Sequence, residues 1–134
     1  MIKALIATSF VFIACTQSNP RYEYIVKDDA FRKKIGKENF VKARHGFTYF
    51  ESQNITRDEI LVFIHGFSVP SYIWDETYFE AINRGLGVIR LDLYGRGFSS
   101  NPNIVYNDLL YADQVIDLLD SLNLTKKVNF IGLS

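Results

Sequence analysis

The sequence predicts an α/β fold built on a parallel, doubly wound sheet. Short apolar runs at residues 60–64, 87–91 and 128–131 have the length and composition of buried strands. The two stretches between these runs place apolar residues at helical spacing. Because helices alternate with strands, we expect the three strands to run parallel, with right-handed crossover connections.

Two shorter segments precede this pattern and are expected to form a strand pair. They are residues 40–44 and 47–52, with His45-Gly46 as the turn between them. The next run, residues 60–64, is continuously apolar. A strand that is covered on both faces of a sheet has this pattern.

The predicted helices carry recognisable end signals. Asp75 and Glu76 occupy the first turn of the first helix, and Gly85 is placed as its C-terminal stop. The apolar residues of this helix are Trp74, Tyr78, Ala81 and Ile82. Asn107 is placed to cap the second helix, with Asp108 near its positive end. We expect the second helix to bury a stripe made of Leu109, Ala112, Ile116 and Leu119, flanked by Val115, Leu118 and Leu122.

The composition describes one globular domain without a marked charge. The chain has 134 residues, is 48% hydrophobic and carries a formal net charge of +0. Basic residues between Arg32 and Arg44 are interleaved with acidic ones, so we interpret them as a solvated face. No nucleic-acid motif, metal-ligand spacing or phosphate-binding glycine loop occurs. We therefore expect no nucleic-acid partner, no metal and no other cofactor.

The amino-terminal residues differ from the rest of the chain. Lys3 is followed by an uncharged run at 4–14, shorter than the roughly 20 apolar residues that a membrane-spanning helix needs. Such a run is typical of a secretory signal and predicts export. Residues 11–15, Val-Phe-Ile-Ala-Cys, resemble a bacterial lipoprotein box, which implies lipidation of Cys15. The protein would then be anchored to a membrane of the cell envelope.

Two alternatives to lipidation remain open. One is a cleaved signal with an incidental cysteine, which gives a secreted or periplasmic protein, and the other is an uncleaved N-terminal anchor. Cys15 is the only cysteine, so it cannot form an intramolecular disulfide, and lipidation explains an unpaired thiol in an exported protein. We divide the chain into a signal peptide with lipoprotein box at 1–15, a tether and irregular segment at 16–39, and a folded domain at 40–134.

Three short motifs follow the three apolar strands. They are His65-Gly66-Phe67, Asp92-x-x-Gly95-x-Gly97-x-Ser99 and Gly132-x-Ser134. In this order and spacing they resemble the N-terminal half of the α/β-hydrolase superfamily, in which Gly-x-Ser opens the nucleophile elbow. The resemblance covers residues 40–134. It implies a partial doubly wound α/β-hydrolase sheet, with the N-terminal strands and first two helices only, from an N-terminal fragment of a longer hydrolase.

The resemblance implies a role for each residue of the predicted site. Ser134 would be the nucleophile, and the backbone N–H of Phe67 would donate to the negative oxygen of the tetrahedral intermediate. His65 and Gly66 would shape the loop that carries this donor. Related branches that act on epoxides or alkyl halides use aspartate as the nucleophile, so the serine favours hydrolysis of carboxylic esters. The implied substrate is a small-molecule ester or a lipid.

The resemblance places the acid and the histidine of the catalytic triad after the nucleophile. The only histidines here are His65 and His45, which is expected to lie exposed in a turn. Asp92 is expected to organise its own turn. We therefore expect residues 1–134 alone to be inactive, with residues 128–131 as an exposed apolar edge of the sheet. The alternative is a noncatalytic membrane-tethered lipoprotein or binding remnant.

Overall fold

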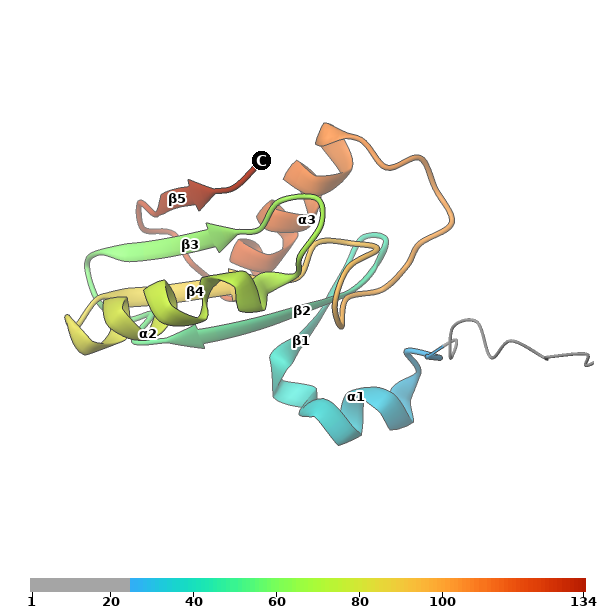
Figure 1. Ribbon diagram of the computed structural model, residues 1–134, viewed down its shortest axis with the longest axis horizontal. Coiled ribbons are helices and arrows are strands. Elements are labelled where there is room, and N and C mark those ends of the chain that lie inside the picture. Colours follow the sequence, from blue (N-terminus) through green and yellow to red (C-terminus); the bar gives the residue numbers. More distant parts are fainter. Residues whose placement is uncertain (1–24) are drawn as a thin grey trace, which may run out of the picture.

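The computed structural model describes residues 25–134, which form a five-stranded mixed sheet flanked by helices (Figure 1). The strand order is β1-β2-β4-β3-β5. This arrangement confirms the α/β fold class with a partial doubly wound sheet. The predicted signal peptide, Cys15 and the first part of the predicted tether lie outside the described residues.

The first two strands form an antiparallel hairpin. β1 (Phe40–Ala43) pairs with β2 (Gly46–Gln53), close to the strand pair predicted at 40–44 and 47–52. β2 then pairs antiparallel with β4 (Gly87–Leu91). The hairpin therefore adds an antiparallel part to a sheet whose other strands run parallel.

The three strands that precede the motifs are parallel, as predicted. β3 (Ile60–Ile64) lies between β4 and β5 (Asn129–Gly132) and pairs in parallel with both. Every residue of β4 is buried, because β4 lies between β2 and β3. Among the described residues β5 pairs only with β3, and Phe130 is 55% exposed. β5 thus forms the exposed apolar edge expected for residues 128–131.

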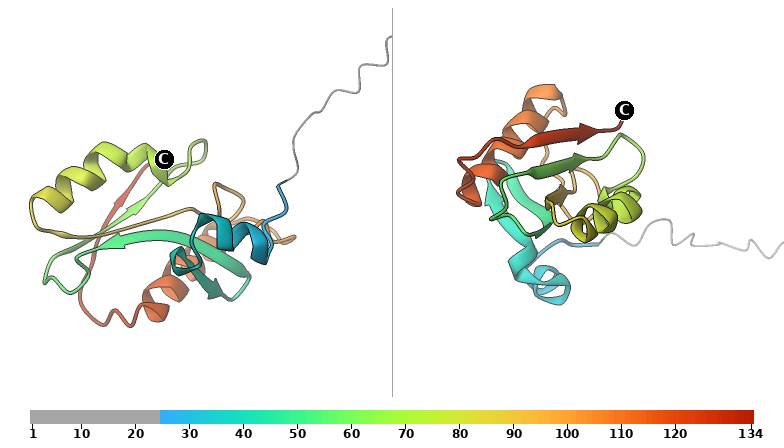
Figure 2. Two further views of the ribbon diagram at one scale, coloured as in Figure 1. Left: turned by 90° about the horizontal axis from the view of Figure 1, so that it is seen from below. Right: turned by 90° about the vertical axis from the view of Figure 1, so that its left-hand side faces the viewer.

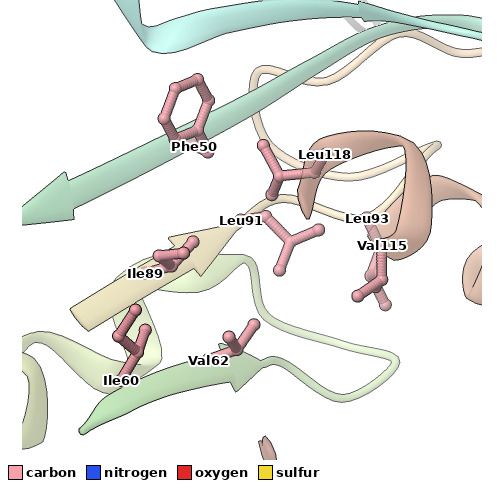
Figure 3. Close-up of a cluster of buried hydrophobic side chains, with 8 residues drawn as sticks. All are labelled: Phe50, Ile60, Val62, Ile89, Leu91, Leu93, Val115 and Leu118. Atoms are coloured by element: carbon pink, nitrogen blue, oxygen red, sulfur yellow. The ribbon is translucent and has the colours of Figure 1, made fainter. Parts of the chain in front are cut away.

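Helices cover the sheet on opposite faces (Figure 2). α2 (Asp75–Asn83), preceded by the 3₁₀-helix η2 (Ser71–Trp74), packs on one face, and α3 (Asp108–Ser121) packs on the other. Side chains alternate along β3, so that Phe63 packs on the α2 side and Val62 on the α3 side. The core on the α3 side contains Phe50, Ile60, Val62, Ile89, Leu91, Leu93, Val115 and Leu118 (Figure 3).

The buried face of α3 differs from the predicted stripe. The helix buries Leu110, Gln114, Val115 and Leu118. Leu109 and Ile116, which we placed in the stripe, are 70% and 51% exposed. The prediction was wrong for Leu109 and Ile116, because α3 is apolar on two faces and Gln114 makes the buried face resemble a polar one, whereas the predicted flanking residues Val115 and Leu118 are buried. Asn107 caps the helix as predicted, since its side-chain oxygen accepts the backbone N–H of Leu110.

A short helix occupies part of the segment that we predicted to be irregular. Asp29–Ile35 forms α1 and Lys37–Asn39 forms the 3₁₀-helix η1. The Asp28 carboxylate caps α1 by accepting the Phe31 N–H, and Gly36 ends it at a φ of 127°. α1 has no buried residue, so the apolar periodicity that would predict it is missing. In the described part of the chain, no helix is long and apolar enough to cross a membrane.

Candidate active site

The three motifs meet at one edge of the sheet. Because β3, β4 and β5 are parallel, three segments leave the sheet at its carboxyl edge (Figure 1). They are the loop after β3 (residues 65–70), the turn after β4 (residues 92–100) and the residues after β5. Open α/β sheets bind their ligands beyond the carboxyl ends of the strands. The structure thus places Ser134 and Phe67, the predicted nucleophile and oxyanion donor, at this edge.

Ser134 packs against the loop after β3. The backbone N–H of Leu133 donates to the carbonyl of Ile64 at 3.1 Å, which extends the pairing of β3 and β5 toward Ser134. A Cβ atom on Gly66 would lie 3.1 Å from the carbonyl carbon of Ser134. Glycine at position 66 therefore permits the loop to approach Ser134 closely. At Gly132 such an atom would lie 3.9 Å from its nearest neighbour, so the described residues do not require glycine there.

Ser134 and Phe67 share a pocket. The pocket has a volume of about 130 Å³ and is lined by Gly66, Phe67, Ser68, Val69, Ile73, Leu133 and Ser134. Within residues 25–134 the Phe67 N–H has no hydrogen-bond acceptor, so this donor is available to a substrate oxygen. The Phe67 side chain is 80% exposed, which means that core packing does not hold it.

His65 is the buried anchor of this loop. Its ring is 1% exposed, and Nε2 accepts the backbone N–H of Leu93 at 2.9 Å. Nε2 therefore carries no hydrogen, and Nδ1 of the neutral imidazole donates to the carbonyl of Gly66 at 2.7 Å. Both ring nitrogens are engaged, so neither can take the proton of Ser134. The other histidine, His45, lies exposed in the turn between β1 and β2.

The Asp92 carboxylate ties the turn after β4 to the loop after β3. Oδ1 accepts the backbone N–H of Ser71 at 2.9 Å, and Oδ2 accepts that of Phe98 at 2.8 Å. Gly97 adopts a φ of 44°, and a Cβ atom there would lie 1.9 Å from Oδ2 of Asp92, so only glycine fits. Both carboxylate oxygens of Asp92 are thus occupied in organising the turn, as expected from the motif.

Gln114 is a residue of this arrangement that the motifs do not predict. Its side-chain oxygen accepts the backbone N–H of Tyr94 at 2.8 Å, and its Nε2 donates to the carbonyl of Asp92 at 3.0 Å. The side chain is 1% exposed. The sequence does contain a signal for Gln114, since it lies four residues from Leu110 and four from Leu118 on one face of the helix. A polar residue within a buried stripe needs a hydrogen-bond partner.

Arg96 is a second residue of this arrangement that the motifs do not predict. Its Nε donates to the carbonyl of Phe67 at 2.6 Å, and its guanidinium carbon lies 4.5 Å from the centre of the Phe67 ring. None of the ion pairs in the described residues involves Arg96. Arg96 stands between Gly95 and Gly97 at a position where the motif specifies no residue type, so no role could be inferred for it.

Lys27 fastens the amino-terminal segment to the turn after β4. Its Nζ donates to the carbonyl of Ser99 at 2.5 Å and to the side-chain oxygen of Asn101 at 3.0 Å. Burial lowers the pKa of Lys27, and the negative charge of Asp92 opposes this effect.

No group of three or more His, Cys, Asp or Glu side chains within residues 25–134 is arranged to hold a metal ion.

The sequence profile of the Alpha/beta hydrolase family matches residues 61–134, which is more than half of the chain and includes all three motifs. The chain belongs to this family. The order of elements in this α/β hydrolase chain agrees, since each motif follows a parallel strand at the carboxyl edge. No curated protein matches the chain in sequence.

Several solved structures are similar to this α/β hydrolase chain. Est816, described as an N-acyl homoserine lactone degrading enzyme, is 29% identical with a TM-score of 0.64, over 71% of this chain and 35% of its own. A carboxylesterase structure from the thaumarchaeon Nitrososphaera gargenis is 28% identical with a TM-score of 0.65, over 71% and 36%. A hydrolase from Pseudomonas aeruginosa is 25% identical with a TM-score of 0.64, over 71% and 36%. The chain thus spans about a third of the length of these proteins.

Proposed function

We propose that this chain provides the nucleophile and the oxyanion loop of a serine hydrolase that acts on carboxylic esters. The observation that carries the proposal is the pocket shared by Ser134 and the unpaired N–H of Phe67. Two similar solved proteins, at 29% and 28% identity, are described as a lactone-degrading enzyme and a carboxylesterase, and lactones are cyclic carboxylic esters. This similarity supports a small-molecule ester or a lipid as the substrate.

The proposed reaction begins with attack of Ser134 Oγ on the ester carbonyl while a histidine base takes the hydroxyl proton. The carbonyl oxygen becomes an oxyanion and accepts a hydrogen bond from the Phe67 N–H and one from a second backbone donor. The bond between the carbonyl carbon and the alcohol oxygen then breaks, and the alcohol leaves with the proton that the base returns. Water, deprotonated by the same base, then attacks the acyl carbon. The bond between that carbon and Ser134 Oγ breaks, the base returns the proton to Oγ, and the carboxylic acid is released.

The triad base and acid are assigned to residues outside this sequence. His65 has both ring nitrogens engaged, and His45 lies exposed in the hairpin turn. In this fold the second oxyanion donor is the residue after the nucleophile, and loss of one such donor costs about 2.7–4 kcal/mol of transition-state stabilisation. The polypeptide of residues 1–134 by itself is therefore expected to be inactive.

The test is labelling with a fluorophosphonate probe, which reacts with activated serine hydroxyls. The protein to use is the product of the gene read past the Ser134 codon, with Ser134→Ala and the polypeptide of residues 1–134 as controls. We expect labelling at Ser134, located by peptide mass spectrometry, together with hydrolysis of p-nitrophenyl acetate. Both controls should stay unlabelled. Labelling of a different residue, or hydrolysis that survives Ser134→Ala, contradicts the proposal.

The alternative is a noncatalytic membrane-tethered lipoprotein or binding remnant. The observation that favours it is that His65, the histidine of the loop after β3, has both ring nitrogens engaged and cannot act as the base. The codons after Ser134 separate the two possibilities. A continuation with glycine two residues later, and with an aspartate and a histidine further on, supports the hydrolase, whereas a stop followed by unrelated sequence supports the alternative.

We also propose export and membrane anchoring through lipidation of Cys15, with a secreted or periplasmic protein as the alternative. The support is the lipoprotein-box resemblance and the single cysteine. Radiolabelled palmitate should enter the wild-type protein, and Cys15→Ser should abolish both the label and processing of the precursor. Failure of palmitate to enter, with processing unaffected by Cys15→Ser, rules lipidation out.

A further inference from the structure

We propose that Arg96 is a positioning residue of the oxyanion hole, which fixes the backbone of Phe67 so that the Phe67 N–H stays free beside Ser134. This role rests on the function proposed above. Arg96 holds Phe67 in two ways, by the hydrogen bond from Nε to the Phe67 carbonyl at 2.6 Å and by the guanidinium against the ring at 4.5 Å. The contact joins the turn after β4 to the loop after β3.

The two peptide groups of Phe67 are held by different side chains. The peptide between Gly66 and Phe67 contains the Phe67 N–H, and its carbonyl accepts from His65 Nδ1 at 2.7 Å. The peptide between Phe67 and Ser68 contains the carbonyl that Arg96 binds. In a trans peptide the C=O and N–H groups point in opposite directions, and no cis peptide occurs in the described residues. The Gly66 carbonyl held by His65 therefore sets the direction of the Phe67 N–H. Arg96 holds the next carbonyl and the ring, which keeps the Phe67 backbone from rotating away without occupying that donor.

The loop itself has little else to hold Phe67. The Phe67 ring is 80% exposed, and within residues 25–134 no backbone N–H of residues 66–69 finds an acceptor. Arg96, in contrast, is anchored in the turn after β4. Its backbone N–H donates to the carbonyl of Leu93 at 3.0 Å, and its Nη1 donates to the carbonyl of Gly95 at 3.1 Å. The turn is thus a firm support from which Arg96 reaches the loop.

Two other roles of the guanidinium make different predictions. Arg96 lines a pocket of about 410 Å³ together with Phe67 and Tyr111 and lacks a carboxylate partner among the described ion pairs, so it could bind an anionic substrate group. That role predicts a change in KM that is confined to charged substrates. A purely structural role predicts a lower melting temperature. Positioning of the oxyanion donor predicts a lower kcat for a neutral ester at unchanged KM and unchanged melting temperature.

The kinetic experiment uses the active protein described above and the neutral ester p-nitrophenyl acetate. Arg96→Met keeps an unbranched stem of similar length to that of arginine but removes the guanidinium and its donors, and we expect kcat to fall about tenfold to a hundredfold because the Phe67 N–H is displaced. Arg96→Lys should recover part of the rate, since an ammonium can donate to the Phe67 carbonyl but cannot stack flat on the ring. Arg84→Met is the matched control, because the Arg84 side chain is 71% exposed and, among residues 25–134, forms an ion pair only with Glu80.

Three results would overturn the positioning role. The first is an unchanged kcat in Arg96→Met. The second is a raised KM with unchanged kcat, which would assign Arg96 to substrate binding. The third is a lower melting temperature in Arg96→Met that accounts for the lost rate, so that activity per folded molecule is unchanged.

A second measurement does not depend on activity. In isotope-labelled protein, Arg96→Met should shift the ring resonances of Phe67 and the amide nitrogen of Ser68, whose peptide contains the carbonyl that Arg96 binds. Arg84→Met should shift neither. Unchanged Phe67 and Ser68 resonances in Arg96→Met overturn the positioning role even if Ser134 is labelled. A wild-type protein that is unlabelled at Ser134 overturns the proposed function, whatever the resonances show.

Discussion

The turn after β4 and the loop after β3 lie at the same edge of the sheet but use their backbone hydrogen-bonding groups differently. In the turn, the N–H groups of Gly95, Phe98 and Ser100 all donate within the protein. In the loop, the N–H groups of residues 66–69 have no acceptor among the described residues. Most N–H groups of the turn are therefore satisfied within the protein, whereas the loop keeps its donors available.

This difference shows how a small fold supports a loop that offers its own donors to a ligand. Such a loop cannot hold itself with those donors, so neighbouring side chains must hold it. His65 binds the Gly66 carbonyl, Asp92 binds the Ser71 N–H, and Arg96 binds the Phe67 carbonyl. Each of these hydrogen bonds depends on the turn after β4, because Asp92 and Arg96 belong to it and the Leu93 N–H binds the ring of His65. A substitution that distorts the turn should therefore also displace the loop.

The largest effect is expected for Gly97→Ala, which acts on the turn. The new Cβ would lie 1.9 Å from Oδ2 of Asp92 at a φ of 44°. Strain and steric conflict together should lower the free energy of unfolding by about 4 kcal/mol, measured by urea denaturation. Gly85→Ala is the control, since Gly85 also has a positive φ of 79° but no atom within 4 Å of the added Cβ. It should cost about 1 kcal/mol, and equal losses in both variants would show that the Asp92 contact is unimportant.

Asp92→Ala should have the next largest effect. The substitution leaves the buried N–H of Ser71 and the partly buried N–H of Phe98 without their acceptor. We expect a loss of about 3 kcal/mol in urea denaturation, because each unsatisfied buried donor costs about 1–3 kcal/mol. Asp58→Ala is the control, because it removes a fully exposed carboxylate 3.8 Å from Lys126 and should leave stability unchanged. A loss below about 1 kcal/mol in Asp92→Ala would indicate that water replaces the carboxylate.

Gly66→Ala probes the loop rather than the turn. The added Cβ would lie 3.1 Å from the carbonyl carbon of Ser134, so the loop and the nucleophile must move apart. In the active protein we expect fluorophosphonate labelling of Ser134 to slow about tenfold. The free energy of unfolding should change by less than about 1 kcal/mol, because the loop lies outside the core. An unchanged labelling rate would mean that this contact does not set the position of Ser134.

The smallest effect is expected for Phe31→Ala, which loosens the turn from its outer side. The Phe31 ring contacts Phe98 edge-on at 5.8 Å, and we expect a loss of about 1 kcal/mol. Phe79→Ala removes a similar contact with Tyr78 at 5.6 Å and should cost a similar amount. The two variants should differ in hydrogen exchange of the Phe98 amide, which we expect to quicken only in Phe31→Ala. Equal exchange in both would show that α1 does not support the turn.

The sheet could be predicted from the sequence, whereas the hydrogen bonds between the turn after β4 and the loop after β3 could not. The run at 60–64 is continuously apolar because both of its faces are covered, and its predicted bounds match β3. The predicted buried face of α3 differs from the observed one because the helix is apolar on two sides. α1 was not predicted because none of its residues is buried. No role could be predicted for Arg96, because its partner is a backbone carbonyl 29 positions away in the chain. Every residue type has a backbone carbonyl, so the residue at position 67 gives no sign of this contact.

The attachment of Lys27 to the turn after β4 has a mechanical consequence. Lys27 precedes α1 and β1 in the chain, and its ammonium group binds the carbonyl of Ser99. A pull on the chain before Lys27 therefore acts on the turn after β4 through this hydrogen bond, and not only on β1 through the backbone. The same turn carries Asp92 and Arg96, which hold the loop of Phe67. Tension on the amino-terminal segment thus reaches the loop of Phe67 through this turn, in addition to the load that the backbone carries through α1 into β1.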